Sequence, residues 1–276
     1  MRIKLDKVTY TYPHSRYPAL DNVSISFEEN GFVSLIGPIG SGKSTLLTTL
    51  MGLVIPGSGR VYVDGSVMPK RGKELREHRR KAGMVFQFPE MQIFESTALR
   101  EVMFGLRNFE FPADEIEERA FSALDMVGLP PHQFAGRPPF EMSGGEKRRL
   151  ALASILALRP EFLLLDEPTA GLDARGKILL KDILGQYQTG GGSVILVTHD
   201  LDLAAELCRR VVIMSDGRIL YDGSREVFYD FFMMKKSRLR PPELVLAWEN
   251  FRMEKKVPNR RVYSISEALA GITNSL

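Results

Sequence analysis

The chain has 276 residues, of which 44% are hydrophobic and 26% are charged, values that indicate a soluble globular protein and exclude a disordered one. The formal net charge of +3 argues against a nucleic-acid partner, because non-specific binding to nucleic acid needs a concentrated basic face. A single cysteine cannot form a disulfide within the chain, and four scattered histidines offer no cluster of metal ligands. The longest uncharged stretch, residues 44–59, is too short to cross ~30 Å of hydrocarbon.

The expected elements alternate between strands and helices along the chain. The first 30 residues predict short strands, because apolar side chains alternate with polar ones at Val8, Tyr10 and Tyr12. Uninterrupted apolar runs then predict strands that are buried on both faces: residues 32–36, 84–86, 162–165 and 194–197. Since helical stretches separate these runs, we expect βαβ units and a largely parallel sheet. The stretch from about residue 88 to 159 is mostly helical and predicts an insertion in this sheet domain.

The sequence from Gly37 to Ser44, GPIGSGKS, matches the phosphate-binding loop G-x-x-x-x-G-K-[ST]. Its glycines allow backbone N–H groups to turn inward around an anion. Lys43 adds a positive charge for the β- and γ-phosphates, and the hydroxyl of Ser44 can bind Mg²⁺. The residues expected to contact the nucleotide here are Gly37, Pro38, Ile39, Gly40, Ser41, Gly42, Lys43, Ser44 and Thr45.

Two further motifs complete the expected chemistry. Asp166 and Glu167 follow an apolar strand, where Asp166 would hold Mg²⁺ and Glu167 would orient or deprotonate the attacking water. Ser143 and Glu146 form a capping-box pattern before a good helix. A cap does not explain the glycines between them, Gly144 and Gly145, since each costs about 1 kcal/mol in a helix. Both glycines make sense if a phosphate approaches the N–H groups at the positive end of the helix.

Taken together, these motifs resemble the ATP-binding-cassette (ABC) ATPases. The segments that carry the resemblance occur in the family's order and spacing: GPIGSGKST, Gln87 in VFQFPEMQIF, MSGGEKRR, LLLDEPTAGLD and the TH pair at residues 198–199. The match extends from residue 3 to about residue 228. The stretches FPEMQIF, ALREVMFGLRN and RPPELVLAWENF are most similar to those of ATPases from energy-coupling-factor importers of vitamins and transition metals.

The resemblance implies a fold and a division of the chain. The fold is α/β, a P-loop NTPase core with a mostly parallel sheet, an antiparallel β subdomain, a helical subdomain and a small C-terminal extension. Residues 1–230 would form the nucleotide-binding domain and residues 231–276 the C-terminal extension. In that extension Leu244, Trp248 and Phe251 lie at helical spacing. This stripe fits both a helix packed on its own domain and a contact between two subunits.

The resemblance also assigns roles to individual residues. Tyr12 would stack on adenine, and Gln87 would contact Mg²⁺ and the attacking water while sensing the membrane partner. His199 would hydrogen-bond the γ-phosphate, and Asp173 would link two subunits near it. The signature residues Ser143–Gly145 would close on ATP held by the opposite subunit.

Three positions depart from the family pattern. Ile39 stands where a polar residue is common, and Met142 and Glu146 replace the commoner Leu and Gln of the signature. Ile39 leaves the backbone nest intact. The carboxylate of Glu146 would either weaken closure on a triphosphate or be kept turned away by its capping role.

The function implied by the resemblance is ATP hydrolysis that powers an importer of a vitamin or transition-metal ion, with ATP and Mg²⁺ as cofactors. The partners would be a second ATPase subunit of the same or a related chain, an integral membrane coupling protein and a substrate-binding membrane subunit. The protein would be peripheral, at the cytoplasmic face of the cell membrane. DNA-repair ATPases carry a long coiled coil between the phosphate loop and the signature, and this chain has no sustained heptads there. A soluble ABC ATPase of iron–sulfur cluster assembly remains the alternative.

Residues 88–104, here called the coupling segment, mix apolar side chains with Glu90, Glu95 and Glu101. This composition predicts an amphipathic groove with acidic rims, suited to a short helix of a membrane partner. The competing interpretation is that the three acids are only solvated.

Overall fold

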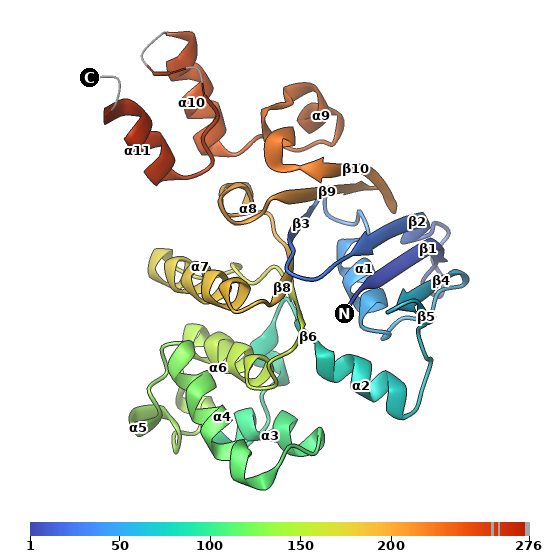
Figure 1. Ribbon diagram of the computed structural model, residues 1–276, viewed down its shortest axis with the longest axis vertical. Coiled ribbons are helices and arrows are strands. Elements are labelled where there is room, and N and C mark those ends of the chain that lie inside the picture. Colours follow the sequence, from blue (N-terminus) through green and yellow to red (C-terminus); the bar gives the residue numbers. More distant parts are fainter. Residues whose placement is uncertain (255–256, 259, 274–276) are drawn as a thin grey trace.

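The computed structural model describes residues 1–254, 257–258 and 260–273 (Figure 1). Its larger sheet has six strands in the order β10-β9-β3-β8-β7-β6, of which only β10 runs antiparallel to its neighbour. The strands are β3 (Phe32–Ile36), β6 (Ala82–Val85), β7 (Phe162–Asp166), β8 (Ser193–Val197), β9 (Arg210–Ser215) and β10 (Arg218–Ser224). Every residue of β3, β6, β7 and β8 is buried, which confirms the parallel core that the apolar runs predict.

Helices cover both faces of this sheet, and successive residues of a strand enter different cores. In β7, Leu163 and Leu165 pack in one core with α6, whereas Leu164 packs in the other with α1. The helices around the sheet are α1 (Lys43–Leu50), α2 (Lys73–Lys81), α7 (Ala174–Thr189) and α8 (Leu201–Leu207). The insertion between β6 and β7 contains η1 (Pro89–Gln92), α3 (Ala98–Asn108), α4 (Ala113–Met126), α5 (Pro131–Phe134), η2 (Pro139–Glu141) and α6 (Gly144–Leu156).

A second, antiparallel sheet has four strands in the order β2-β1-β4-β5. Its strands are β1 (Ile3–Tyr10), β2 (Leu20–Phe27), β4 (Ser58–Val63) and β5 (Ser66–Val67). The predicted alternation through Tyr12 is wrong in one respect, because β1 ends at Tyr10. There the carbonyl of Tyr10 accepts the N–H of Ala19 at 2.8 Å, which closes the turn that leads into β2. Tyr12 therefore lies in this turn, outside the sheet.

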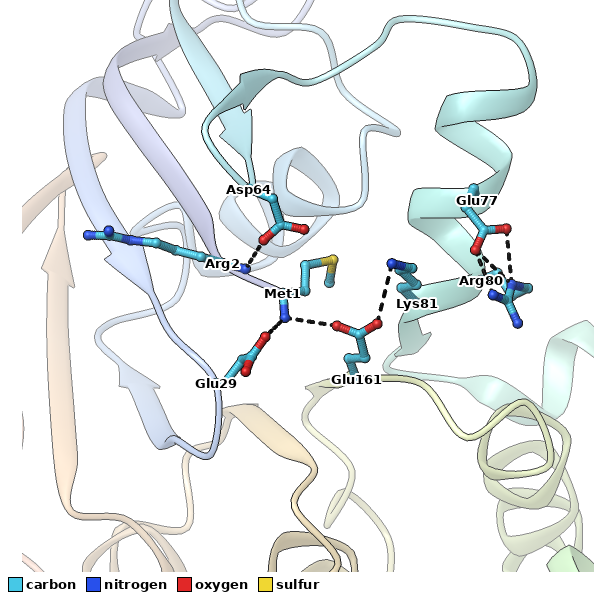
Figure 2. A network of polar contacts seen from close by, with 8 residues as sticks. All are labelled: Met1, Arg2, Glu29, Asp64, Glu77, Arg80, Lys81 and Glu161. Carbon is cyan, nitrogen blue, oxygen red and sulfur yellow. Dashed lines mark hydrogen bonds and ion pairs between the residues drawn. The ribbon is translucent and has the colours of Figure 1, made fainter.

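A polar network ties the antiparallel sheet to the start of β7 (Figure 2). The amine of Met1 contacts the carboxylates of Glu29 and Glu161, the latter at 2.8 Å. Lys81, the last residue of α2, reaches the other oxygen of Glu161 at 3.5 Å. Both glutamates are partly exposed, so the pairs contribute little stability, but they mark where the two sheets meet.

The chain continues past the sheet into η3 (Arg225–Tyr229), α9 (Phe231–Lys236), α10 (Glu243–Met253) and α11 (Ile265–Thr273). Trp248, Val262 and Ala268 form a small separate core here. Of the predicted apolar stripe, Trp248 is buried while Phe251 is 45% exposed, so part of the stripe packs on its own helices and part faces outward. Residues 255–256, 259 and 274–276 of the C-terminal extension lie outside the described residues.

These observations confirm the predicted fold class. A mostly parallel sheet carries an antiparallel sheet on one side, a helical region on the other and additional helices at the C-terminal end (Figure 1). In the described part of the chain no helix combines the length and apolar character needed to span a bilayer.

Candidate nucleotide site

The phosphate loop joins β3 to α1, and two of its glycines are required by the chain's own packing. A Cβ atom at Gly37 would lie 2.2 Å from the carbonyl oxygen of Met214, and one at Gly42 would lie 2.3 Å from that of Ala19. Gly42 also has a φ of 100° at the N-cap of α1, a conformation that favours glycine. Gly40 also has a positive φ of 78°, but a Cβ there would meet no described atom within 4 Å. The two ends of the loop are thus closely packed against other backbone segments, and its middle is open.

Lys43 folds back into this loop. Its ammonium donates hydrogen bonds to the carbonyl oxygens of Gly37 and Pro38 at 2.8 and 2.9 Å. Burial lowers the pKa of Lys43, while the nearby carboxyl groups of Glu167 and Asp166 act to raise it. The loop therefore holds the ammonium group of Lys43 at a place where backbone N–H groups of the loop can also bind an anion.

Asp166 lies at the end of β7, next to the start of α1. Its carboxylate is buried beside the hydroxyl of Ser44, and burial raises its pKa against the opposing effects of Ser44 and Lys43. Mg²⁺ prefers oxygen ligands and is usually held by one or two protein groups together with substrate phosphates and water. The oxygen pair of Ser44 and Asp166 fits that preference. The described residues contain no group of three or more His, Cys, Asp or Glu side chains that could hold a metal ion unaided.

Glu167 is held in an unusual backbone conformation with a φ of 53°, of the kind that clusters at functional sites. One carboxylate oxygen, Oε2, accepts the backbone N–H of His199 at 3.0 Å. The other, Oε1, is buried and has no hydrogen-bond partner among the described residues, although Nε2 of His199 lies 3.0 Å away. Burial is the main cause of a raised pKa at Glu167. A carboxylate with one anchored and one unsatisfied oxygen can accept a hydrogen bond from water.

The remaining residues around the site come from neighbouring loops. Val85 pairs with Leu165, so Gln87 emerges at the same sheet edge as the acidic pair, and it is exposed. The hydroxyl of Tyr12 shares a hydrogen bond of 3.1 Å with the hydroxyl of Thr45, and Tyr12 as a whole residue is 45% exposed. This places an open aromatic ring directly beside the phosphate loop.

Asp173 lies at the other end of the acidic turn. It is exposed and caps α7, with Oδ1 accepting the N–H of Gly176 at 2.7 Å. Its side chain therefore helps to begin α7, the first helix after β7.

The signature helix α6 lies against the opposite face of the sheet from α1 (Figure 1). Ser143 and Glu146 form a reciprocal capping box, with bonds of 3.3 and 2.7 Å. The backbone N–H of Ser143 is the main cause of a lowered pKa at Glu146. Of the two alternatives for Glu146, the structure therefore shows the one in which the carboxylate is turned back onto its own helix.

Gly144 and Gly145 are not required by the surrounding fold. A Cβ atom at either position would meet no described atom within 4 Å. Their backbone N–H groups stand at the open N-terminal end of α6, where the helix dipole favours an anion. Because α6 and α1 lie on opposite faces of the sheet, these N–H groups suit a phosphate other than the one at the chain's own loop.

The predicted acidic rims of the coupling segment are wrong for Glu101. That side chain is buried, and its Oε2 accepts the N–H groups of Phe94 and Glu95 at 3.1 and 2.9 Å. Local hydrogen bonding to the turn before α3 outweighs solvation. The segment nevertheless exposes large apolar side chains, namely Phe88, Met91, Phe94 and Phe104.

Sequence reasoning missed Arg148, which contacts two loops of the site. The only signal was a basic run, KRR, after the signature, and that run indicates no more than an exposed helix face.

Comparisons with known proteins agree with this geometry. A family model for ABC transporters matches residues 20–170. The chain is 37% identical to the energy-coupling factor transporter ATP-binding protein EcfA2 of Clostridium perfringens, over 97% of this chain and 96% of that protein. It is 39% identical to EcfA2 of Symbiobacterium thermophilum, over 100% of this chain and 97% of that protein.

Two solved structures show the same fold. CbiO1 of Clostridium perfringens, described as part of the ABC transporter complex CbiONQ, has a TM-score of 0.75 and 31% identity, covering 91% of this chain and 98% of that one. The dimeric ATP-binding cassette MJ0796, bound to ADP and Pi, has a TM-score of 0.72 and 33% identity, covering 81% of this chain and 98% of that one.

Proposed function

Since the chain belongs to the ABC transporter family, among its energy-coupling factor transporter ATP-binding proteins, we propose that it hydrolyses ATP to power a membrane importer of a vitamin or a transition-metal ion. The observation that carries the proposal is the acidic pair at the end of β7, set between the phosphate loop and His199. The relatives' names favour this function over the alternative of iron–sulfur cluster assembly.

In the proposed reaction, the phosphate loop binds the triphosphate and Lys43 exchanges its two carbonyl contacts for phosphate oxygens. The exposed ring of Tyr12 stacks on adenine, and His199 donates a hydrogen bond to the γ-phosphate. Oε1 of Glu167 accepts a hydrogen bond from the attacking water, which it orients or deprotonates. Because Oε2 is already bound to the backbone of His199, the base and the γ-phosphate contact are held in a fixed relation.

Ser44 and Asp166 would hold Mg²⁺, with Gln87 reaching the ion and the water from the neighbouring loop. When bound, this ion neutralises negative charge on the β- and γ-phosphates. The chain's contribution is to present two oxygen donors at the mouth of the phosphate loop.

The active unit is proposed to be a dimer of this chain with itself or with a related subunit. Gly144 and Gly145 leave the end of α6 open, so the signature residues can close on ATP bound by the opposite subunit. Asp173, exposed beside the acidic turn, would contact the other subunit. The dimeric cassette MJ0796 supports this arrangement.

The importer also needs membrane components, an integral coupling protein and a substrate-binding subunit. The exposed apolar side chains of the coupling segment offer a surface for the coupling protein. This segment begins directly after Gln87. The protein would then be peripheral to the membrane, at its cytoplasmic face.

Purification from native membranes in mild detergent tests the proposal. We expect a tagged chain to recover an ATPase partner and integral membrane proteins, and the recovered complex to hydrolyse ATP. A matched Glu167→Gln preparation should recover the same partners without hydrolysis. Recovery of the chain from the soluble fraction alone, together with iron–sulfur assembly proteins, would contradict the importer.

A further inference from the structure

One guanidinium group joins two loops of the site to the signature helix. Nε and Nη2 of Arg148, on α6, donate to the two carboxylate oxygens of Glu90 at 3.3 and 3.2 Å. Its third nitrogen, Nη1, donates to the carbonyl oxygen of Ala170. The side chains of Arg148 and Glu90 are only 18% and 24% exposed, so solvent screens this pair less than an open surface pair.

Arg148 lies on α6 and contacts both the coupling segment and the turn that follows Glu167. Glu90 lies in η1, within the coupling segment and shortly after Gln87. Ala170 lies in the turn between Glu167 and Asp173, and its own N–H donates to the carbonyl oxygen of Glu167 at 3.1 Å. Arg148 itself is carried by the helix that the signature residues begin.

The guanidinium of Arg148 packs closely against the backbone at Gly171. Gly171 has a φ of 69°, and a Cβ atom there would lie 2.6 Å from Nη1 of Arg148. Glycine at this position therefore serves both the backbone conformation and the approach of the guanidinium. Burial alone would raise the pKa of Glu90, but its bonds to Arg148 hold that pKa below its usual value. The carboxylate thus stays ionised and paired.

We propose that Arg148 is a positioning residue that transmits displacements of the coupling segment to the turn between Glu167 and Asp173. The inference deepens the proposed function, on which it rests. The planar guanidinium binds two partners in fixed directions, so a displacement of Glu90 shifts Arg148 and with it the carbonyl of Ala170. A membrane partner that moves the coupling segment thereby moves the backbone next to the catalytic base, and α6 moves with both.

Hydrogen exchange of the full-length protein without nucleotide tests this coupling directly. Glu90→Gln should raise exchange not only in residues 88–95 but also in residues 168–176, by about 3- to 10-fold, within the range of couplings between sites. Gly171→Ala should raise exchange in residues 88–95 by a similar factor. In an Arg148→Met background, neither substitution should have any effect on the distant segment.

Two further variants keep the result interpretable. Glu115→Gln removes a comparable ion pair to Arg119, 2.7 Å long within α4, and should leave both segments unchanged. Arg148→Lys keeps the charge but lacks the rigid fork, so it should abolish the cross-effects even if Arg148→Met unfolds. Cross-effects that are absent in the wild-type background, or that survive in Arg148→Lys, would overturn the proposal.

Enzyme kinetics separate this inference from the proposed function. We expect Arg148→Lys to lower kcat for ATP hydrolysis while the KM for ATP stays within about twofold, because the phosphate loop is untouched. If no importer is recovered with the chain but the exchange cross-effects are present, the coupling holds and the importer fails. If transport is intact in Arg148→Lys, the importer holds and the coupling fails.

Discussion

The backbone N–H of His199 donates to Oε2 of Glu167 at 3.0 Å, across 32 positions of sequence. The contact exists because β7 and β8 are adjacent parallel strands, so that the loops following them leave the sheet side by side. It fixes the carboxylate through one oxygen and leaves Oε1 unsatisfied by the described residues. With His199 as the proposed γ-phosphate contact and Glu167 as the proposed base, this bond joins the two roles, and changes at either residue should affect hydrolysis more than ATP binding.

Glu167→Gln should retain ATP binding and lose hydrolysis by ~10²–10⁴-fold, the usual range for a positioned general base. The amide oxygen can still accept the N–H of His199, so the backbone conformation at this position should persist. Single-turnover hydrolysis and binding of a fluorescent ATP analogue measure the two properties separately. The variant should also accumulate as an ATP-bound closed dimer in size-exclusion chromatography. A normal turnover rate would assign water activation to another residue.

The acid limb of the pH profile of kcat/KM should report Glu167. Because burial raises the pKa of this carboxyl and the base must be ionised, activity should fall with decreasing pH at a higher pH than an ordinary glutamate would give. Activity should also fall with increasing pH at a lower pH than an ordinary lysine would give. Burial lowers the pKa of Lys43, and the phosphate loop needs the charge of that side chain. The residual activity of Glu167→Gln should lack the acid limb. An unchanged acid limb in that variant would assign it to another group.

Lys43→Ala should largely abolish ATP binding. We expect the affinity for ATP to fall about 100-fold, because charge-assisted hydrogen bonds to the phosphates are lost. The side chain bonds only to groups of its own loop, the carbonyl oxygens of Gly37 and Pro38 and the hydroxyl of Ser41, and water can take its place at these groups when it is removed. The fold should therefore survive, as circular dichroism can verify. Titration with a fluorescent ATP analogue is the measurement, and unchanged affinity would contradict the phosphate-loop assignment.

The parts of the fold that sequence predicts well are those with local causes. Apolar runs such as 162–165 predict buried parallel strands, and the glycine pattern around Lys43 predicts a loop in which Gly37 and Gly42 prove to be required by packing. The capping box of Ser143 is predicted as well, because it depends on two residues of one helix turn. Each of these features follows from the conformational preferences of a few neighbouring residues.

Contacts between distant segments are what the sequence could not supply. Glu101 looks like a solvated acid in the sequence, yet it closes the turn before α3 by accepting two backbone N–H groups. Arg148 looks like one member of a basic run, yet it reaches Glu90 and Ala170, 58 and 22 positions away. Such partners are fixed only when the sheet brings the loops after β6 and β7 to one edge.

Ser143→Arg should stop turnover without preventing ATP binding at the chain's own phosphate loop. A long cation at the open end of α6 would occupy the space that Gly144 and Gly145 leave free, and it would block closure on the partner's phosphate. For the same reason, specific activity of the wild type should rise with protein concentration where dimers are only partly formed. Activity per molecule that is constant down to mostly monomeric samples would refute a shared site.

The coupling segment should bind the membrane partner through its exposed apolar side chains. Met91 and Phe94 are 83% and 64% exposed, although burying a side chain of this size is worth about 1.5–3 kcal/mol. Phe94 is further held by an edge-to-face contact with Phe104, with ring centroids 4.8 Å apart. A fixed apolar surface of this kind suits the apolar face of a short helix.

The double substitution Met91→Asp with Phe94→Asp should leave the ATPase activity of the isolated protein nearly intact and reduce recovery of the membrane partner at least about tenfold, the equivalent of 1.4 kcal/mol. Glu90 is left unchanged in this test, because its bond to Arg148 would add an internal effect to the loss of binding. The control is Val67→Asp, which places one such carboxylate at a 55% exposed apolar residue of β5. Pull-down from detergent-solubilised membranes and substrate uptake are the two measurements. Equal recovery and equal uptake by the double variant would place the contact with the membrane partner elsewhere on the protein.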